Sequence, residues 1–228
     1  MAGTTRTSKA TGSGRSYHQY CAVARALDLI GDRWTLLLIR DLLLGPKRYK
    51  DLLEGLPGIG TNLLADRLRD LEALGVVERA VLPPPAGSSV YRLTEVGEAL
   101  EPVVVAIGRW GAQFLGPVRQ TDTLAPGAYF VAMRAVFSPE LAAGMRETFE
   151  LHIGGRVFEV RIDAGRCSTS EGQATDPDVV LRMDVETLNA LLLEGFPPAE
   201  ALAGGRVELT GDPDALERFV RVFPFRQP

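Results

Sequence analysis

The chain has 228 residues, of which 46% are hydrophobic and 24% charged, and its formal net charge is −4. This composition is typical of a globular protein with room for one or two domains. No apolar run reaches the roughly 18 residues that a membrane span needs, so we expect no membrane partner.

The first 16 residues, "MAGTTRTSKATGSGRS", predict a disordered arm. The segment lacks the apolar core of a signal peptide and carries Arg6, Lys9 and Arg15 without any acid. Cys21 and Cys167 are the only cysteines, which argues against a disulfide scaffold and suits a reducing compartment. We therefore expect a cytoplasmic protein.

Charge is distributed unevenly along the chain. Residues 1–118 hold 14 Lys and Arg against 12 Asp and Glu, whereas residues 119–228 hold 11 against 17. A uniformly acidic protein would be a poor partner for nucleic acid, but a mildly basic front half leaves nucleic-acid binding open.

The front half predicts four helices and then a β-hairpin. The helices are expected at Tyr20–Ile30, Trp34–Leu44, Arg48–Leu56 and from Gly60 or Thr61 to Gly75. The segments "GVVERAVL" and "SVYRLT" are rich in β-forming residues and predict two strands. Between them, "PPPAGSS" must form a loop, because three prolines cannot sit in a paired ladder. We expect Thr94 to cap a last helix, "EVGEALEPVVVAIGRWGAQFL", that Pro102 and two glycines bend.

The fourth helix has two unlike faces. Four leucines (Leu64, Leu68, Leu71 and Leu74) follow the spacing of a buried stripe. The opposite face carries short side chains and one arginine: Asn62, Ala65, Asp66, Arg69 and Ala73. An ordinary solvent-exposed face would explain this pattern for a helix considered alone.

The order of elements favours a different interpretation. A short helix, a tight "LPGIG" turn and a second helix with a leucine back predict a helix-turn-helix, and the following hairpin predicts its wing. A helix in the major groove needs a face of short side chains, with polar groups near its N-terminus that reach base edges. Asn62 can pair with adenine, and Thr61 with the first backbone N–H groups can hold a phosphate.

The segment from Tyr17 to Pro117 resembles the HxlR family of winged helix-turn-helix transcriptional regulators. The resemblance rests on the cysteine at the start of the first helix and on "IGDRW", "LLLGPKRYKDL", "LPGI", "RLRDLEALGVVER", "YRLTEVG" and "GRWG". It implies a homodimer that binds a palindromic operator in double-stranded DNA, and we expect a repressor.

Two departures from the family pattern bear on DNA contact. Family members commonly have serine in place of Gly60, so Thr61 is expected to take over the helix cap. The wing tip is usually basic, but here it is uncharged, which leaves more of the contact to other residues. The candidate DNA-binding residues are Lys47, Arg48, Lys50, Thr61, Asn62, Ala65, Asp66, Arg69, Arg79 and Arg92.

Two residues of the front half each keep two interpretations. Arg67 lies near the leucine edge of its helix, where a structural ion pair and a phosphate contact are both plausible. Some regulators that this chain resembles sense oxidants through the cysteine equivalent to Cys21, and Arg25 one turn on favours a thiolate. A small buried hydrophobic residue in a helix of the dimer interface is the alternative for Cys21.

The back half predicts an α+β domain after a linker near "GPVRQTDTLAPG". "TFELHIGGRVFEVRID" alternates as a hairpin, "RCSTSEG", "DVVLRMD" and "RVELTG" add strands, and "VETLNALLLEG", "PPAEALAGG" and "DPDALERFVRVF" predict helices. The pattern "VETLNALLLEG" followed by "LAGGRVELTGDPDALERF" resembles sterol-carrier-protein-type domains. The expected fold class is thus α+β, with an arm at 1–16, a winged helix-turn-helix and dimerisation domain at 17–117, a linker at 118–126 and a sterol-carrier-like domain at 127–226.

That second resemblance implies an apolar tunnel for a hydrophobic small-molecule effector. The candidate lining residues are Phe130, Met133, Met145, Phe149, Leu188 and Leu192, each of which can equally fill a core. The alternative is a domain that serves only oligomerisation or partner docking.

The sequence gives little support for catalysis. His18 and His152 are the only histidines and have no metal-ligand spacing, Ser168, Thr169 and Ser170 have no evident base, and no phosphate-binding glycine motif occurs. We therefore expect no enzymatic activity, no metal and no cofactor.

Overall fold

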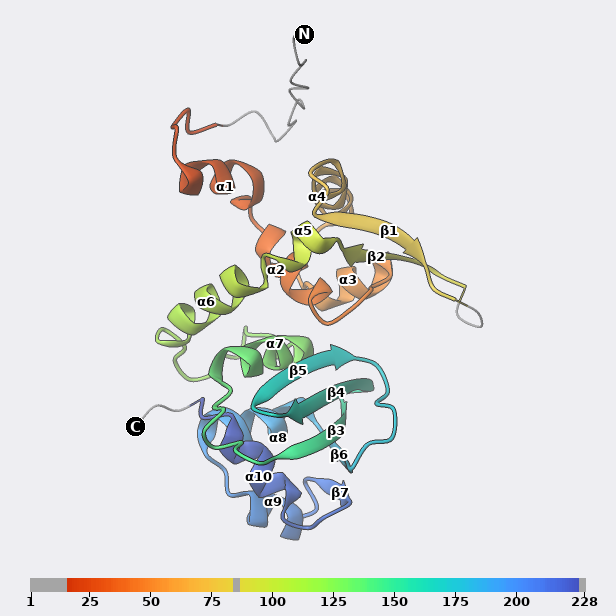
Figure 1. The fold of residues 1–228 in the computed structure, drawn as a ribbon, viewed down its shortest axis with the longest axis vertical. Coiled ribbons are helices and arrows are strands. Elements are labelled where there is room, and N and C mark those ends of the chain that lie inside the picture. Colours follow the sequence, from red (N-terminus) through yellow and green to blue (C-terminus); the bar gives the residue numbers. More distant parts are fainter. Residues whose placement is uncertain (1–15, 84–86, 226–228) are drawn as a thin grey trace. The chain divides into compact units, whose positions relative to one another are not determined.

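The computed structural model describes residues 16–83 and 87–225 of the chain (Figure 1). Except for Ser16, the arm lies outside the described residues, as does the centre of the wing loop. Contacts between residues divide the chain into two compact units. Unit 1 comprises Met1–Leu42 and Pro46–Glu101, and unit 2 comprises Leu43–Gly45 and Pro102–Pro228. The clustering of contacts divides the chain between Glu101 and Pro102. The expected domain boundary at 117/118 remains a prediction.

Unit 1 has the order of elements that the sequence predicts. Its elements are α1 (Ala22–Ile30), α2 (Thr35–Leu42), α3 (Tyr49–Gly55), α4 (Thr61–Ala73), β1 (Val77–Val81), β2 (Ser89–Leu93) and α5 (Glu95–Glu98). β1 and β2 pair antiparallel, with Val77 opposite Leu93 and Val81 opposite Ser89. The fold is therefore a helical unit with one hairpin, as expected for a winged helix-turn-helix.

The leucine back of α4 forms much of the core of unit 1. Leu64, Leu68 and Leu71 are at most 1% exposed, which confirms the stripe predicted from their spacing. Gly75 follows the helix with a φ of +69°, the left-handed conformation expected after its end. Of the two candidate caps, Gly60 occupies the N-cap position, in an extended conformation and without a side-chain bond, and Thr61 is the first helical residue, so Thr61 does not take over the cap.

The predicted last helix of the front half is divided in two. Thr94 caps α5, because its Oγ1 accepts a hydrogen bond from the N–H of Gly97 at 3.2 Å. A new helix, α6 (Glu101–Ala112), carries Pro102 in its first turn, where proline removes no helical hydrogen bond. The bend predicted at this proline is therefore a full break.

Gly97 is the position in unit 1 least able to accept a side chain. A Cβ there would lie 2.2 Å from the carbonyl oxygen of Val76 and 3.0 Å from Leu93. We expect Gly97→Ala to lower the free energy of unfolding by about 1–3 kcal/mol, because the backbone at Val76, just before β1, must shift. Gly108→Ala is the matched control, since a Cβ there meets nothing within 4 Å and should stabilise the helix by about 0.5–1 kcal/mol. Urea unfolding followed by circular dichroism measures both, and equal effects would contradict the expected clash.

Unit 2 is built on a five-stranded mixed sheet with strand order β5-β4-β3-β6-β7. Its strands are β3 (Arg146–Ile153), β4 (Arg156–Asp163), β5 (Arg166–Glu171), β6 (Val179–Met183) and β7 (Glu208–Thr210). β3 pairs antiparallel with β4 and parallel with β6. All five strands coincide with segments that the sequence analysis assigned to strands.

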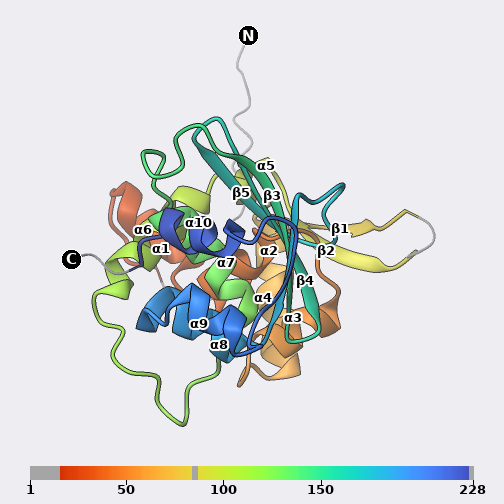
Figure 2. The same ribbon diagram turned by 90° about the horizontal axis from the view of Figure 1, so that it is seen from below.

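One face of this sheet forms the core of unit 2. Phe158, Val160 and Ile162 are at most 1% exposed, whereas Arg161 and Asp163 alternate with them and are exposed, which confirms the predicted hairpin. Figure 2 shows the helices on one side of the sheet, and their apolar residues join the same cluster. These helices are α7 (Pro126–Val136), α8 (Val185–Asn189), α9 (Pro198–Ala203) and α10 (Ala215–Val222).

Two helices of unit 2 differ from the expectation. Proline at position 126 begins α7, so the expected linker gives way to a helix that the sequence analysis did not assign. The predicted helix over "VETLNALLLEG" is α8 followed by a π-helical turn, Ala190–Glu194, which Gly195 ends with a φ of +72°. Proline is favoured at the first positions of a helix, and Pro126 is the local signal that marks the start of α7.

Candidate nucleic-acid interface

The α3–turn–α4 segment positions the candidate recognition helix. α3 ends at Gly55 with Leu56 as its C-cap, and the chain reverses through Gly58, whose φ is +92°. Leu56 and Ile59 are buried beneath this turn. The Tyr49 hydroxyl donates a 2.6 Å hydrogen bond to the carbonyl oxygen of Thr61, which ties the first turn of α4 to α3. The two helices are thus held together by apolar burial and by one polar contact.

The outer face of α4 has the character that the sequence predicts. Thr61, Asn62, Asp66 and Arg69 are exposed, and Ala65 is half-buried between them. Asp66 Oδ1 lies 2.9 Å from Arg69 Nη1, so the acid holds the arginine along the helix surface. An amide, a carboxylate and a guanidinium on one exposed helix face are the groups that read base edges in a major groove.

The basic residues before α4 do not lie together at the surface. Arg48 and Lys50 are exposed, and Lys50 Nζ lies 3.4 Å from Glu54 Oε1. Lys47 is only 5% exposed, and its backbone forms an isolated β-bridge with Tyr91 of the hairpin. The structure therefore does not place Lys47 at the surface where a phosphate contact was expected.

Both candidate arginines of the wing strands are paired with acids. Arg79 Nε donates to Glu72 Oε1 at 2.9 Å, and this hydrogen bond raises the pKa of Arg79 further above its ordinary value. Arg92 Nε donates to Glu78 Oε1 at 2.7 Å, and Glu78 is the residue opposite Arg92 in the β1–β2 register. The wing tip itself falls on residues 84–86, outside the described part of the chain.

The structure supports a structural role for Arg67. Its Nη1 lies 2.8 Å from Asp32 Oδ2, in the connection between α1 and α2, and 3.0 Å from Asp70 Oδ2. Its side chain is only 17% exposed. The arginine therefore joins α4 to the α1–α2 connection, as one of its two interpretations expected.

Cys21 does not have the surroundings of a core residue. It is exposed and occupies the N-cap position of α1, one residue before the helix begins. Backbone N–H groups of Ala24 and Val23 lower the pKa of its thiol. Burial instead raises the pKa of the Cys167 thiol to about 12. A thiol at a helix N-terminus with a lowered pKa is the environment expected of a reactive cysteine.

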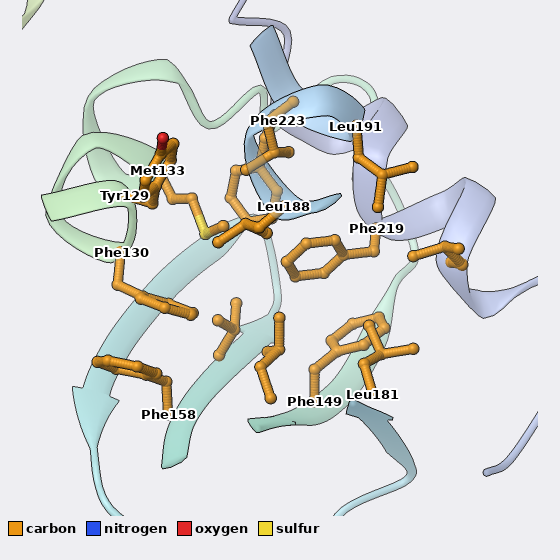
Figure 3. Packing of buried hydrophobic residues seen from close by; sticks show 14 of the residues in the cluster. Tyr129, Phe130, Met133, Phe149, Phe158, Leu181, Leu188, Leu191, Phe219 and Phe223 are labelled. Carbon is orange, nitrogen blue, oxygen red and sulfur yellow. The ribbon is translucent and has the colours of Figure 1, made fainter. Parts of the chain in front are cut away.

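The candidate effector-binding residues lie within the packed core of unit 2 (Figure 3). Phe130, Met133, Phe149, Leu188 and Leu192 are each at most 4% exposed, and Met145 is partly buried against them. The ring of Phe130 stacks on that of Phe158 with centroids 4.0 Å apart, and the rings of Phe149 and Phe219 lie 5.1 Å apart. These contacts are those of core residues.

His152 and Thr169, which the sequence analysis considered for catalysis, each have a partner within hydrogen-bond distance. His152 Nε2 lies 2.7 Å from Glu150 Oε1, and Thr169 Oγ1 donates to the carbonyl oxygen of Phe130 at 2.9 Å. Within residues 16–83 and 87–225, no group of three or more His, Cys, Asp or Glu is arranged to hold a metal ion. The helices in this part of the chain are also too short or too polar to cross a bilayer.

The sequence analysis missed the acids Glu72 and Glu78, which neighbour the candidate arginines of the wing. The register of the hairpin places Glu78 opposite Arg92 and was available as a signal. Glu72 and Arg79 belong to different elements, α4 and β1, and only the tertiary fold brings them together.

Comparisons with known proteins match both halves of the chain. Residues 29–119 match the family model for HxlR-like helix-turn-helix proteins, and residues 149–228 match that for a sterol carrier protein domain. The HTH-type transcriptional regulator YodB of Bacillus subtilis is 44% identical over 92 residues, which cover 40% of this chain and 82% of YodB. The regulator YvaP of the same organism is 34% identical over 93 residues, covering 41% and 86%. A solved structure of reduced YodB from B. subtilis shares 40% identity, covers 44% of this chain and 100% of its own, and has a TM-score of 0.38.

Proposed function

Because this chain belongs to the HxlR-like helix-turn-helix family of transcriptional regulators, we propose that it is a dimeric repressor that binds a palindromic operator in double-stranded DNA. We further propose that it acts in the cytoplasm and catalyses no reaction. The observation that carries the proposal is the exposed polar face of α4, with Asn62, Asp66 and Arg69 over a buried leucine back.

An exposed apolar stripe supports the dimer. None of the residues of α6 is buried, and Val103, Ile107 and Trp110 are 42%, 48% and 63% exposed. These residues are spaced at i, i+4 and i+7, which places them on one side of the helix, and the exposed Phe114 follows just after the helix ends. α1 likewise exposes Val23 and Leu27, four residues apart. Pairing such faces with a second copy removes apolar surface from water, and a dimer presents two α4 helices about 34–36 Å apart.

The proposal is tested by selecting DNA fragments from a genomic library with the purified protein and by sedimentation. We expect a dimer at micromolar concentration that retains a palindromic fragment. Trp110→Asp should give a monomer with weakened operator binding, because a charge in an apolar interface is costly. Val96→Asp is the matched control, since Val96 is 62% exposed on α5 and outside the stripe. A monomeric wild-type protein at this concentration would contradict the proposal.

We propose hydrophobic effector binding for unit 2, with oligomerisation or docking as the alternative. A ligand can loosen DNA binding only if it prefers the DNA-free conformation, and a typical coupling changes affinity about 5–150-fold. The match of residues 149–228 to a sterol carrier protein domain supports effector binding. The packed aromatic core and the exposed stripe of α6 support the alternative. Titrating a long-chain fatty acid or a polycyclic compound should shift the operator affinity of the whole chain, but not that of a fragment ending near Leu115. If the operator affinity of the whole chain does not change, effector binding is contradicted and oligomerisation or docking remains.

Thiol-based redox sensing at Cys21 is a second candidate, favoured by its exposure and its lowered pKa. A lowered pKa means that more of the thiol is ionised at neutral pH, and the thiolate is the reactive form. We therefore expect brief treatment with iodoacetamide at pH 7 to label Cys21 and to leave Cys167 unmodified. Mass spectrometry of the peptides measures both in one sample, and Cys167 is the internal control. Equal labelling would argue against a sensor role.

A further inference from the structure

The cations of the candidate DNA-binding face are neutralised within the protein. Among the described residues, four of the five exposed candidate cations lie within 4 Å of an acid. We call this set of residues the paired face: Lys50, Arg69, Arg79 and Arg92 with Glu54, Asp66, Glu72 and Glu78, respectively. The formal charges of the paired face cancel, although its four cations are the residues expected to contact phosphates.

The three arginine pairs are close. The Asp66–Arg69 and Glu72–Arg79 pairs have N···O distances of 2.9 Å, and Arg92 Nη2 lies 2.7 Å from Glu78 Oε1. The Lys50–Glu54 distance of 3.4 Å is longer, and both side chains are more than 60% exposed. The arginines are therefore the cations whose charge is most closely balanced.

Stability does not explain this arrangement. Exposed ion pairs typically change a folding equilibrium by a factor of only about 1.4–5, because water and salt screen them. The arginine side chains are 55–70% exposed, so the pairs stay open to solvent. The acids do, however, hold a negative charge about 3 Å from each guanidinium. A phosphate that approaches the arginine must displace the acid or be repelled by it.

This competition weakens one kind of DNA binding more than the other. Non-specific binding comes almost entirely from phosphates that cations neutralise, with release of counterions from the DNA. Operator binding also gains from contacts with base edges, which the acids of the wing strands and the far end of α4 do not oppose. An internally neutralised face therefore reduces affinity for random DNA by a larger factor than affinity for the operator.

We propose that Glu72 and Glu78 are specificity-determining residues, which suppress binding to non-operator DNA by competing with phosphates for Arg79 and Arg92. The inference rests on the proposed DNA-binding function and adds a role for acids within the binding face. The net charge of the chain, −4, is in keeping with a regulator that avoids indiscriminate DNA binding.

The test uses the whole chain and a random-sequence 30-base-pair duplex over a series of salt concentrations. The double variant Glu72→Gln, Glu78→Gln leaves the base-reading face of α4 intact and should bind this duplex about 2- to 25-fold more tightly near 0.15 M salt, since each relieved pair contributes a factor of about 1.4–5. Its slope of log affinity against log salt should steepen by about 0.9 for each phosphate newly contacted. Affinity for the selected operator should rise less, so the ratio of operator to random affinity falls.

A matched double variant separates this effect from a general gain in charge. Glu200→Gln and Glu208→Gln remove the same charge from exposed positions of unit 2 and should change affinity less than twofold.

The outcomes are distinguishable. If the wild-type protein binds DNA and the Glu72, Glu78 variant matches it at every salt concentration, or gains no more than the unit 2 control, the inference is overturned and the proposed function stands. If the wild-type protein and every variant bind neither random nor selected duplexes, the proposed function itself is overturned, and the inference with it.

Discussion

Asn62→Ala and Arg69→Ala are each expected to reduce operator affinity by about 30-fold to 10⁴-fold. A good base contact contributes about 1–3 kcal/mol, and a dimer on a palindrome makes each contact twice, so the loss is about 2–6 kcal/mol. Both side chains are exposed on α4, and their loss leaves the leucine back of the helix in place. The loss should therefore come from recognition rather than from folding.

The measurement is a titration of operator and random duplexes at one salt concentration, with a circular dichroism melt to show that each variant is folded. Lys50→Ala is the control, because an exposed lysine that contacts a phosphate should weaken all sequences alike and flatten the salt dependence. Lys47→Ala is unsuitable, since Lys47 is buried against the hairpin. Equal losses on operator and random DNA for Asn62→Ala and Arg69→Ala would show that α4 does not specify the sequence.

Phe149→Ala is expected to lower the free energy of unfolding of unit 2 by about 3–5 kcal/mol. Phe149 is fully buried on β3, faces Phe219 and lies between strands β4 and β6 (Figure 3). Its removal leaves a cavity that a close-packed core closes only in part. For a unit of this size, the loss corresponds to a fall in melting temperature of about 10–20 °C.

Calorimetry of the whole chain, with hydrogen exchange of the β3 amides, assigns the transition to unit 2. Thr148→Ala is the control, because the neighbouring residue points to the opposite, partly exposed face of the same strand and should cost less than about 1 kcal/mol. A cost below 1 kcal/mol for Phe149→Ala would mean that the site collapses or tolerates a void. Such tolerance would favour the effector hypothesis, since it indicates a core that can open around a ligand.

Local patterns in the sequence determined most of the elements. The leucine spacing of α4, the alternation of β3 and β4 and the polyproline loop of the wing each follow from a few neighbouring residues, so their helices, strands and connection were predictable. The exposed face of α4 was predictable for the same reason, because a buried stripe on a helix fixes which side chains point away from it. Both family resemblances rest on the same linear patterns.

The functional surroundings of individual side chains were decided by contacts between distant segments. Lys47 is buried and forms a β-bridge with Tyr91. Asp32 forms an ion pair with Arg67, and Glu72 forms one with Arg79 of another element. The sequence predicted Cys21 within a helix. In the structure the helix begins one residue later, at Ala22, and leaves the thiol of Cys21 exposed beside backbone N–H groups.

Periodicity along one element says which way a side chain points, but not what lies opposite it. The charge of the DNA-binding face, the reactivity of a thiol and the packing of a core each depend on that second partner. For this protein, the sequence therefore determined the candidate recognition helix and its exposed face. Only the tertiary structure placed Glu72 beside Arg79 and stacked the ring of Phe130 on that of Phe158 inside unit 2.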